Sequence, residues 1–241
     1  MCTLQKRNNI FTLTLTGPTD HRLNPTLISS IRSLLAEAKS QATPGSVLVT
    51  AAEGRFFSNG FDLAWANKNS GGSGAEAVNL LRHMVDLFKD VVADLVNFPM
   101  PTIAAVTGHA AAAGMMLAIS HDYVIMKKDK AVFYMSEVDI GMTLPDYFTA
   151  VMRAKVARPE VRRDVLMRAM KVKGEEALAK GLVYEVYDSV EEVVEASVRL
   201  GEEMGKRKWD GEVYAEIRKS LYPELIGMLG LTTKELVKAR L

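Results

Sequence analysis

Residues 101–114 read PTIAAVTGHAAAAG, and the earlier stretch 56–63 reads FFSNGFDL. Each stretch has the pattern of a strand end, a turn of small residues and the start of a helix. A turn of this kind leaves the first backbone N–H groups of the helix without partners. Two such turns that face each other can hold a developing oxyanion between two amide donors. The two stretches therefore predict enolate chemistry on a thioester, with backbone N–H groups as the electrophilic catalyst that stabilises the oxyanion.

The bulk composition is that of an ordinary globular protein. The chain has 241 residues, enough for one large domain, with 48% hydrophobic and 24% charged residues. A net charge of +1 gives no indication of a nucleic-acid partner or of a membrane surface. The single cysteine, Cys2, excludes an internal disulfide, and the four histidines lack ligand spacing, so no metal is predicted. No apolar run approaches the ~20 residues of a membrane span.

The order of the expected elements predicts an α/β fold. Residues 10–16 alternate as in a half-buried strand, and 46–51 form a continuous apolar strand that suits a sheet covered on both faces. Asn24 and Pro25 are typical of a helix N-terminus. From about residue 144 the chain is mostly helical, apart from a short strand at 181–186. The helices expected there are 147–156, 160–170, 174–180, 190–207 and 211–228.

Two further helices are predicted, one between the two turns and one that follows the second turn. Residues 76–97 follow a flexible Ser70–Gly74 break, and Val78, Leu81 and Phe88 are expected on their inner face. Residues 110–120 are rich in small side chains, which permits close packing of the helix backbone. We expect a sheet-containing core at 1–190 and a helical region at 191–241 within the same fold.

Three ordered stretches resemble the crotonase (enoyl-CoA hydratase/isomerase) superfamily. They are residues 57–63, residues 101–108 and residues 174–183, which read GEEALAKGLV. The similarity covers nearly the whole chain and is greatest to the plant peroxisomal enoyl-CoA delta isomerases. It implies a spiral of ββα units with a C-terminal helical region that packs in homotrimers or dimers of trimers. It also implies an acyl-CoA thioester as substrate, with no cofactor apart from the coenzyme A of the substrate.

The resemblance also implies the site residues. By position, the two oxyanion-hole amides of the family fall on Phe61 and Ala113. The family often has glycine at the second place, but the donor is a backbone N–H, which alanine retains. The residues expected to border the substrate are Ser58, Asn59, Gly60, Phe61, Asp62, Leu63, Ala112 and Met116.

The acids of the site decide between reactions. Hydratases of the family use two glutamates, whose places here are taken by Met116 and Glu137. Methionine can neither orient water nor transfer a proton. One carboxylate suffices to move a proton from C2 to C4 of a 3-enoyl thioester, while the dienolate is held by the two amides. The sequence thus favours isomerisation of 3-enoyl-CoA (cis or trans) to trans-2-enoyl-CoA, in fatty acid β-oxidation. Met116, Ile140, Met142 and Leu144 are expected to line a dry pocket that raises the pKa of Glu137.

The residues also allow different interpretations of the site. Asp146 is either a second acid, as in dienoyl-CoA isomerases, or the N-cap of the helix near Tyr147, and we favour the N-cap. The chain could also hydrate an unusual acyl-CoA, or bind acyl-CoA without catalysis. His109 is expected to be a hydrogen-bonded structural histidine, and Asp62 to hold the first turn by accepting from nearby backbone N–H groups.

The last three residues, Ala239-Arg240-Leu241, are a small–basic–leucine tripeptide. They resemble the peroxisomal S-K-L signal, although a helix end could finish in the same way. We therefore expect a peroxisomal location and recognition by an import receptor.

Overall fold

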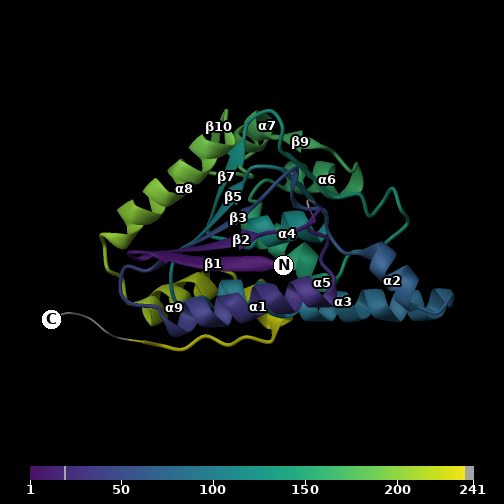
Figure 1. Ribbon diagram of the computed structural model, residues 1–241, viewed down its shortest axis with the longest axis horizontal. Helices are drawn as coiled ribbons and strands as arrows, with labels where there is room; N and C mark the ends of the chain where they lie inside the picture. The colour runs from purple at the N-terminus through teal and green to yellow at the C-terminus, as the bar shows by residue number, and fades with distance from the viewer. Residues whose placement is uncertain (19, 237–241) are drawn as a thin grey trace.

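Two sheets form the centre of the computed structural model, which describes residues 1–18 and 20–236. The larger sheet has the strand order β1-β2-β3-β5-β7-β10, in which β1 is antiparallel to β2 and the other neighbours are parallel. Its strands are β1 (Cys2–Arg7), β2 (Ile10–Leu15), β3 (Val47–Ala52), β5 (Thr102–Val106), β7 (Tyr123–Lys127) and β10 (Glu185–Tyr187), seen in Figure 1.

The smaller sheet has the order β4-β6-β8-β9, and its strands β4, β6 and β8 run parallel. Their bounds are Phe56–Ser58 for β4, His109–Ala111 for β6, Val132–Tyr134 for β8 and Val172–Lys173 for β9. Each parallel strand follows a strand of the larger sheet, β3, β5 or β7, after a short turn. The repeat of two strands and a helix confirms the predicted spiral of ββα units.

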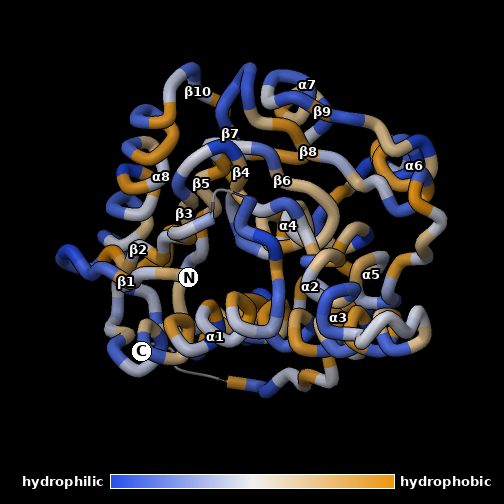
Figure 2. The backbone as a smooth tube through the Cα atoms, turned by 45° about the vertical axis from the view of Figure 1, so that its right-hand side comes forward, coloured by the Kyte–Doolittle hydropathy of each residue, from blue (hydrophilic) through white to orange (hydrophobic). Residues whose placement is uncertain are grey.

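Helices cover both faces of the larger sheet, which explains the continuous apolar sequence of β3. Residues Val47, Val49 and Ile103 face α8, whereas Leu48 and Ala104 belong to the main core on the opposite face. Hydrophobic and hydrophilic residues alternate along α8 (Figure 2). The helices are α1 (Pro25–Ser40), α2 (Leu63–Asn69), α3 (Gly74–Val96), α4 (Ala113–Ile119), α5 (Asp146–Lys155), α6 (Pro159–Met167), α7 (Gly174–Ala179), α8 (Val190–Gly205), α9 (Gly211–Leu221) and α10 (Pro223–Leu229).

Two predicted helices are each divided in the structure. Residues 109–111 form β6 rather than the start of a helix, because they pair with β4 and β8, and α4 begins only at Ala113. The predicted helix 211–228 breaks at Tyr222, since Pro223 lacks the N–H that would continue the hydrogen-bond ladder. The prediction that Val78 faces inward is wrong. Its side chain is 46% exposed because the first turns of α3 extend beyond the sheets (Figure 1).

None of the described helices is long and apolar enough to cross a membrane. Within the described residues, no group of three or more His, Cys, Asp or Glu side chains could hold a metal ion. The tripeptide Ala239-Arg240-Leu241 lies outside the described residues. The division of the chain near residue 190 stays a prediction.

A buried ion pair attaches α9 to the core. Arg218, only 3% exposed, donates to both carboxylate oxygens of Asp122 at 2.6 Å and to the carbonyls of Phe98 and Met100 at 2.6 and 2.7 Å. Burial alone would raise the pKa of Asp122, but the Arg218 guanidinium holds it below its ordinary value. The guanidinium therefore satisfies carbonyls just beyond the end of α3 and a carboxylate at the start of β7.

Arg218→Met is expected to lower the free energy of unfolding by about 3–5 kcal/mol, because it leaves the Asp122 carboxylate buried without its partner. Urea unfolding measures the effect. The matched control is Arg153→Met, because Arg153 pairs with Glu224 where both side chains are about half exposed. A much smaller shift of the midpoint is expected there. Equal midpoints for the two variants would contradict the prediction.

Candidate active site

Three segments of the candidate site follow the carboxyl ends of strands in the smaller sheet. β4 ends at Ser58, β6 at Ala111 and β8 at Tyr134. Since these strands are parallel, their carboxyl ends lie side by side, which is where open α/β sheets bind ligands. The segments that follow are the turn 59–62, residue Ala112 with the start of α4, and the loop 135–145. The fold thus gathers both predicted oxyanion turns and Glu137.

The first turn presents the N–H of Phe61. Gly60 has φ +73°, and its carbonyl accepts from the Leu23 N–H at 2.8 Å, while the Asp62 N–H donates to the Leu23 carbonyl at 3.2 Å. This bridge uses the groups on either side of the Phe61 N–H, which donates to no acceptor among the described residues. Asp62 caps α2 by accepting from the Trp65 N–H at 2.9 Å, which confirms its predicted role in holding the turn.

The second turn presents the N–H of Ala113. Ala113 is the first residue of α4, so its N–H lies at the open end of the helix. The preceding Ala112 has φ +50° and ψ −124°, a conformation that alanine rarely adopts and that costs on the order of 1–3 kcal/mol. Its N–H donates to the carbonyl of Tyr134 at 2.9 Å. Backbone strain therefore lies directly beside the predicted oxyanion donor.

Glycines allow the two turns to touch. A Cβ on Gly114 would lie 2.1 Å from the Ser58 carbonyl oxygen, and one on Gly108 would lie 2.3 Å from that of Arg55. A Cβ on Gly60 would lie 3.5 Å from the Ala113 nitrogen. Because Phe61 follows Gly60, the two predicted donors lie close together.

Glu137 is a buried acid with an unused oxygen. Its side chain is 8% exposed, and Oε2 is buried with no hydrogen-bond partner among the described residues. Burial raises the pKa of the carboxyl, and a hydrogen bond from its own backbone lowers it only in part. The loop turns sharply at this point, where the Ser136 carbonyl accepts from the N–H groups of Asp139 and Ile140. As a result Ile140 is 55% exposed, and its predicted place in the pocket lining is wrong.

The remaining predicted residues differ in burial. Met116 is fully buried in α4, one turn after Ala113. Asp146 is exposed in the first turn of α5, and its prediction as an N-cap is wrong because Pro145, with an extended backbone, occupies that position. A role of Asp146 as second acid stays a prediction. His109 packs against Phe56, and its buried Nδ1 lacks the expected hydrogen bond within the described residues.

Sequence reasoning missed two kinds of neighbour. The ring of Phe61 stacks on Phe148 of α5 at 6.2 Å and meets Phe88 of α3 edge-on at 5.7 Å. Helical periodicity had indicated only Phe88. Tyr134 was also missed, although its hydroxyl donates to Asn59 Oδ1 of the first turn at 3.3 Å. Both contacts join segments that are distant in sequence, and no local pattern could have found them.

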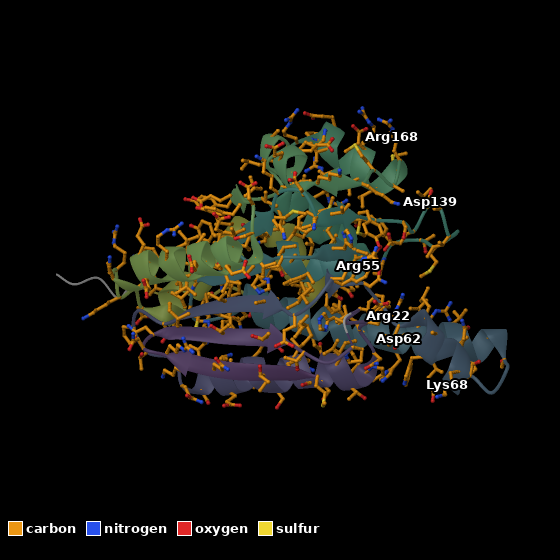
Figure 3. All side chains as sticks on the ribbon, turned by 45° about the horizontal axis from the view of Figure 1, so that its top comes forward. Arg22, Arg55, Asp62, Lys68, Asp139 and Arg168 are labelled. Atoms are coloured by element: carbon orange, nitrogen blue, oxygen red, sulfur yellow. The ribbon has the colours of Figure 1, made fainter. Side chains whose placement is uncertain are left out.

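Cations and a cavity lie beside the first turn. Burial and the negative charge of Asp20 raise the pKa of Tyr134, whereas the positive charges of Arg22 and Arg55 lower it; both arginines are labelled with Asp62 in Figure 3. A cavity of about 690 Å³ is lined by residues that include Arg22, Asp62 and Trp65. Arg22 is paired with Asp20 at 3.3 Å, and Asp20 and Asp62 also line this cavity, so charges of both signs border the first turn.

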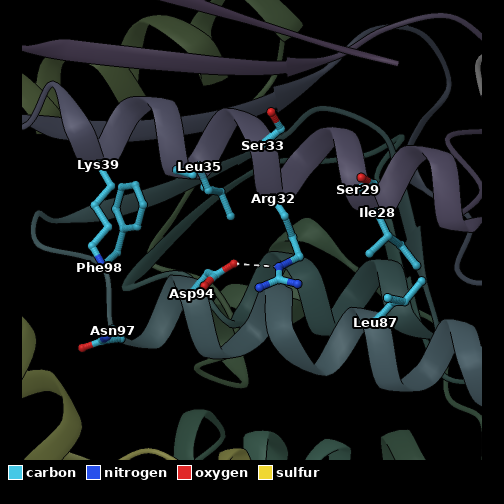
Figure 4. A pocket seen from close by; sticks show the side chains of 11 residues that line it. Ile28, Ser29, Arg32, Ser33, Leu35, Lys39, Leu87, Asp94, Asn97 and Phe98 are labelled. Atoms are coloured by element: carbon cyan, nitrogen blue, oxygen red, sulfur yellow. Dashed lines mark hydrogen bonds and ion pairs between the residues drawn. The ribbon is translucent and has the colours of Figure 1, made fainter.

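A separate cavity of about 450 Å³ lies between α1 and α3 (Figure 4). There Arg32 of α1 donates to Asp94 of α3 at 3.0 Å and to Asp90 at 2.8 Å. None of the three site segments lines it. It is a groove between two helices joined by ion pairs, apart from the candidate active site.

Comparison with known proteins found relatives over nearly the whole chain. Residues 5–222 match the family described as Enoyl-CoA hydratase/isomerase. The chain is 60% identical to Enoyl-CoA delta isomerase 2, peroxisomal, of Arabidopsis thaliana, over 97% of both chains. It is 47% identical to Enoyl-CoA delta isomerase 1, peroxisomal, of the same organism, over 94% of this chain and 91% of that protein. The apo structure of an enoyl-CoA isomerase of Mycobacterium tuberculosis shares the fold, with a TM-score of 0.83 and 22% identity over 95% of this chain and 94% of the other.

Proposed function

Because this chain belongs to the enoyl-CoA hydratase/isomerase family, we propose that it is an enoyl-CoA delta isomerase that converts 3-enoyl-CoA into trans-2-enoyl-CoA. The observation that carries this assignment is the buried Glu137 carboxyl with an unpaired oxygen, at the sheet edge from which both oxyanion turns leave. A buried carboxyl of raised pKa is suited to accept a proton from carbon and to return it.

In the proposed reaction the Glu137 carboxylate removes a proton from C2 of the 3-enoyl thioester. The electrons of the broken C–H bond move toward the thioester carbonyl and form a dienolate, whose oxygen accepts hydrogen bonds from the N–H groups of Phe61 and Ala113. The protonated Glu137 then delivers the same proton to C4. The thioester carbonyl re-forms, and the double bond now lies between C2 and C3. The carboxylate is regenerated, so no other reactant is needed.

Met116 favours this reaction over hydration. Its buried thioether stands one turn after Ala113, where it can neither orient nor activate a water molecule. A dienoyl-CoA isomerase would require Asp146 as a second acid, but that carboxylate is exposed at the start of α5. The single-carboxylate proton shuttle therefore agrees best with the site.

The test uses purified protein with 3-hexenoyl-CoA and, separately, with 2-hexenoyl-CoA, and follows the conjugated enoyl absorbance and the products. Conversion of the 3-enoyl ester into the 2-enoyl ester without a 3-hydroxyacyl product is expected. Rapid hydration of the 2-enoyl ester would instead identify a hydratase. Lack of turnover of either ester would favour a dienoyl-CoA isomerase or a protein that binds acyl-CoA without catalysis.

The value of kcat/KM for 3-hexenoyl-CoA is expected to fall on the acid side with an apparent pKa above 4.5, the ordinary value for glutamate. Only the ionised carboxylate can remove the C2 proton, and burial raises its pKa, so activity is lost as the pH falls through that raised value. A pH–rate profile of the wild-type protein measures this limb. An acid limb at or below pH 4.5 would contradict the assignment of the base.

The peroxisome is the assigned compartment, since it is the one named for the 60% and 47% identical relatives. Recognition of the final tripeptide by an import receptor stays a prediction. We also propose that the coenzyme A part of the substrate lies beside the first turn, where Arg55, and Arg22 with its partner Asp20, are available to its phosphates.

Assembly into homotrimers, or dimers of trimers, is part of the proposal. An apolar face on α9 supports it, because Ile217 and Leu221 are 59% and 66% exposed and Trp209 lies in the same region. Ile217→Glu is expected to shift the sedimentation of the protein toward the 26.5 kDa monomer. Met167→Glu, at an exposed residue of α6, is the control and should sediment like the wild type. An unchanged assembly of Ile217→Glu would show that α9 is not the interface.

A further inference from the structure

We propose that Tyr134 is a positioning residue that ties the two oxyanion turns to each other and to the loop of the catalytic base. This role rests on the proposed function, because it has a meaning only if the Phe61 and Ala113 amides bind a developing oxyanion. Tyr134 is the last residue of β8, and Glu137 follows it by three positions.

Tyr134 contacts each turn with a different group. Its main-chain carbonyl accepts from the N–H of Ala112 at 2.9 Å, one residue before the donor Ala113. Its side-chain hydroxyl donates to Oδ1 of Asn59 at 3.3 Å, two residues before the donor Phe61. The N–H of Asn59 in turn donates to the Asp20 carbonyl at 2.9 Å. One residue is thus bonded to both turns.

Both turns need an external restraint. Gly60 lies between Asn59 and Phe61 at φ +73°, and glycine adopts many backbone conformations at little cost. The Leu23 N–H binds the carbonyl of the peptide that carries the Phe61 N–H, and the bond from Tyr134 adds a second restraint at Asn59, the residue before this glycine. Ala112, by contrast, has an unfavourable backbone conformation, which persists only where the surroundings impose it. The hydroxyl of Tyr134 restrains the first turn and its carbonyl restrains the second.

The charges around Tyr134 suggest a competing role for its hydroxyl. The side chain is half-buried, and burial raises the pKa of Tyr134 while Arg22 and Arg55 oppose that shift. Lys171 Nζ lies 5.7 Å from the centre of its ring. Asp20, which is paired with Arg22 at 3.3 Å, adds to the rise of the Tyr134 pKa. With Arg22 and Arg55 in its surroundings, the hydroxyl could bind a substrate phosphate instead of Asn59. The two roles differ in kinetics, because loss of a phosphate contact weakens substrate binding, whereas a misaligned oxyanion hole slows the chemical step.

Tyr134→Phe removes only the hydroxyl and keeps the ring and the carbonyl bond to Ala112. Its kcat for 3-hexenoyl-CoA is expected to fall about three- to tenfold, with KM within about twofold of wild type, as for loss of one hydrogen bond that aligns a catalytic group. Asn59→Ala should have a similar effect, and the double variant should be no slower than the slower single variant. Tyr123→Phe, at a half-buried tyrosine of β7, is the control, with unchanged kcat and KM.

Three results would overturn the role. A raised KM with unchanged kcat in Tyr134→Phe would assign the hydroxyl to substrate binding, and unchanged kcat and KM would leave it without a role in the reaction. Multiplicative effects in the double variant would show that Tyr134 and Asn59 act independently. If the wild type shows no isomerase activity, the proposed function itself fails. Activity that is lost in Glu137→Gln but equal to wild type in Tyr134→Phe refutes only the role of Tyr134.

Discussion

Glu137→Gln is expected to lower kcat for 3-hexenoyl-CoA by about 10²-fold or more while substrate affinity changes little. Glutamine retains the shape of the side chain but cannot accept the C2 proton. The two amide donors, Phe61 and Ala113, remain in place and still bind the thioester carbonyl. Steady-state kinetics and a binding titration with the same ester measure the two effects separately.

The matched control is Asp139→Asn, two residues further along the same loop, where the carboxylate is exposed. It should leave kcat within about twofold of wild type, as for a surface substitution away from the reacting atoms. Activity of Glu137→Gln close to that of this control would exclude Glu137 as the base.

Glu137→Gln should also raise the stability of the protein. The pKa of Glu137 is raised on folding, so the folded state binds this proton more tightly than the unfolded chain does. Above pH 4.5 the unfolded chain ionises first, and the free energy of unfolding of the wild type falls as the pH rises toward the folded pKa. The stability advantage of Glu137→Gln should therefore grow across that range and vanish below it. Lower activity together with higher stability is typical of an acid buried for catalysis.

Gly114→Ala is expected to lower kcat by at least about 10²-fold and the free energy of unfolding by about 1–3 kcal/mol or more. The added Cβ would lie 2.1 Å from the Ser58 carbonyl oxygen and 2.7 Å from its carbonyl carbon, and these backbone atoms cannot swing aside. β4 and α4 must then separate, which moves the Phe61 donor away from the Ala113 donor. Urea unfolding and steady-state kinetics on the soluble fraction measure the two effects.

Gly227→Ala provides the control. Gly227 is also within a helix, α10, but a Cβ there would meet nothing within 4 Å. It should increase stability by up to about 1 kcal/mol, because alanine favours the helix over glycine, and should leave kcat unchanged. If Gly114→Ala behaves in the same way as Gly227→Ala, the two turns are not held together by this close contact.

Residue patterns alone identified the features that depend on neighbours in the chain. The alternation in β2, the apolar run of β3 and the Asn24 cap of α1 are visible because strand, helix and cap preferences act over a few residues. The two turns before Phe61 and Ala113 were also visible in the residues, whereas the roles assigned to Phe61, Ala113 and Glu137 came from the resemblance of ordered motifs to the family.

Other features were decided only when distant segments met. Residues 109–111 carry the small side chains of a helix, yet they form β6 because strands β4 and β8 lie on either side with free hydrogen-bonding groups. The unpaired oxygen of Glu137, the burial that raises its pKa and the two bonds of Tyr134 likewise arise from packing between remote parts of the chain. Local propensity is a property of adjacent residues, whereas desolvation and hydrogen-bond satisfaction depend on everything that surrounds a group in space. The type of chemistry could therefore be predicted from the residues, but the environment that enables it exists only in the folded chain.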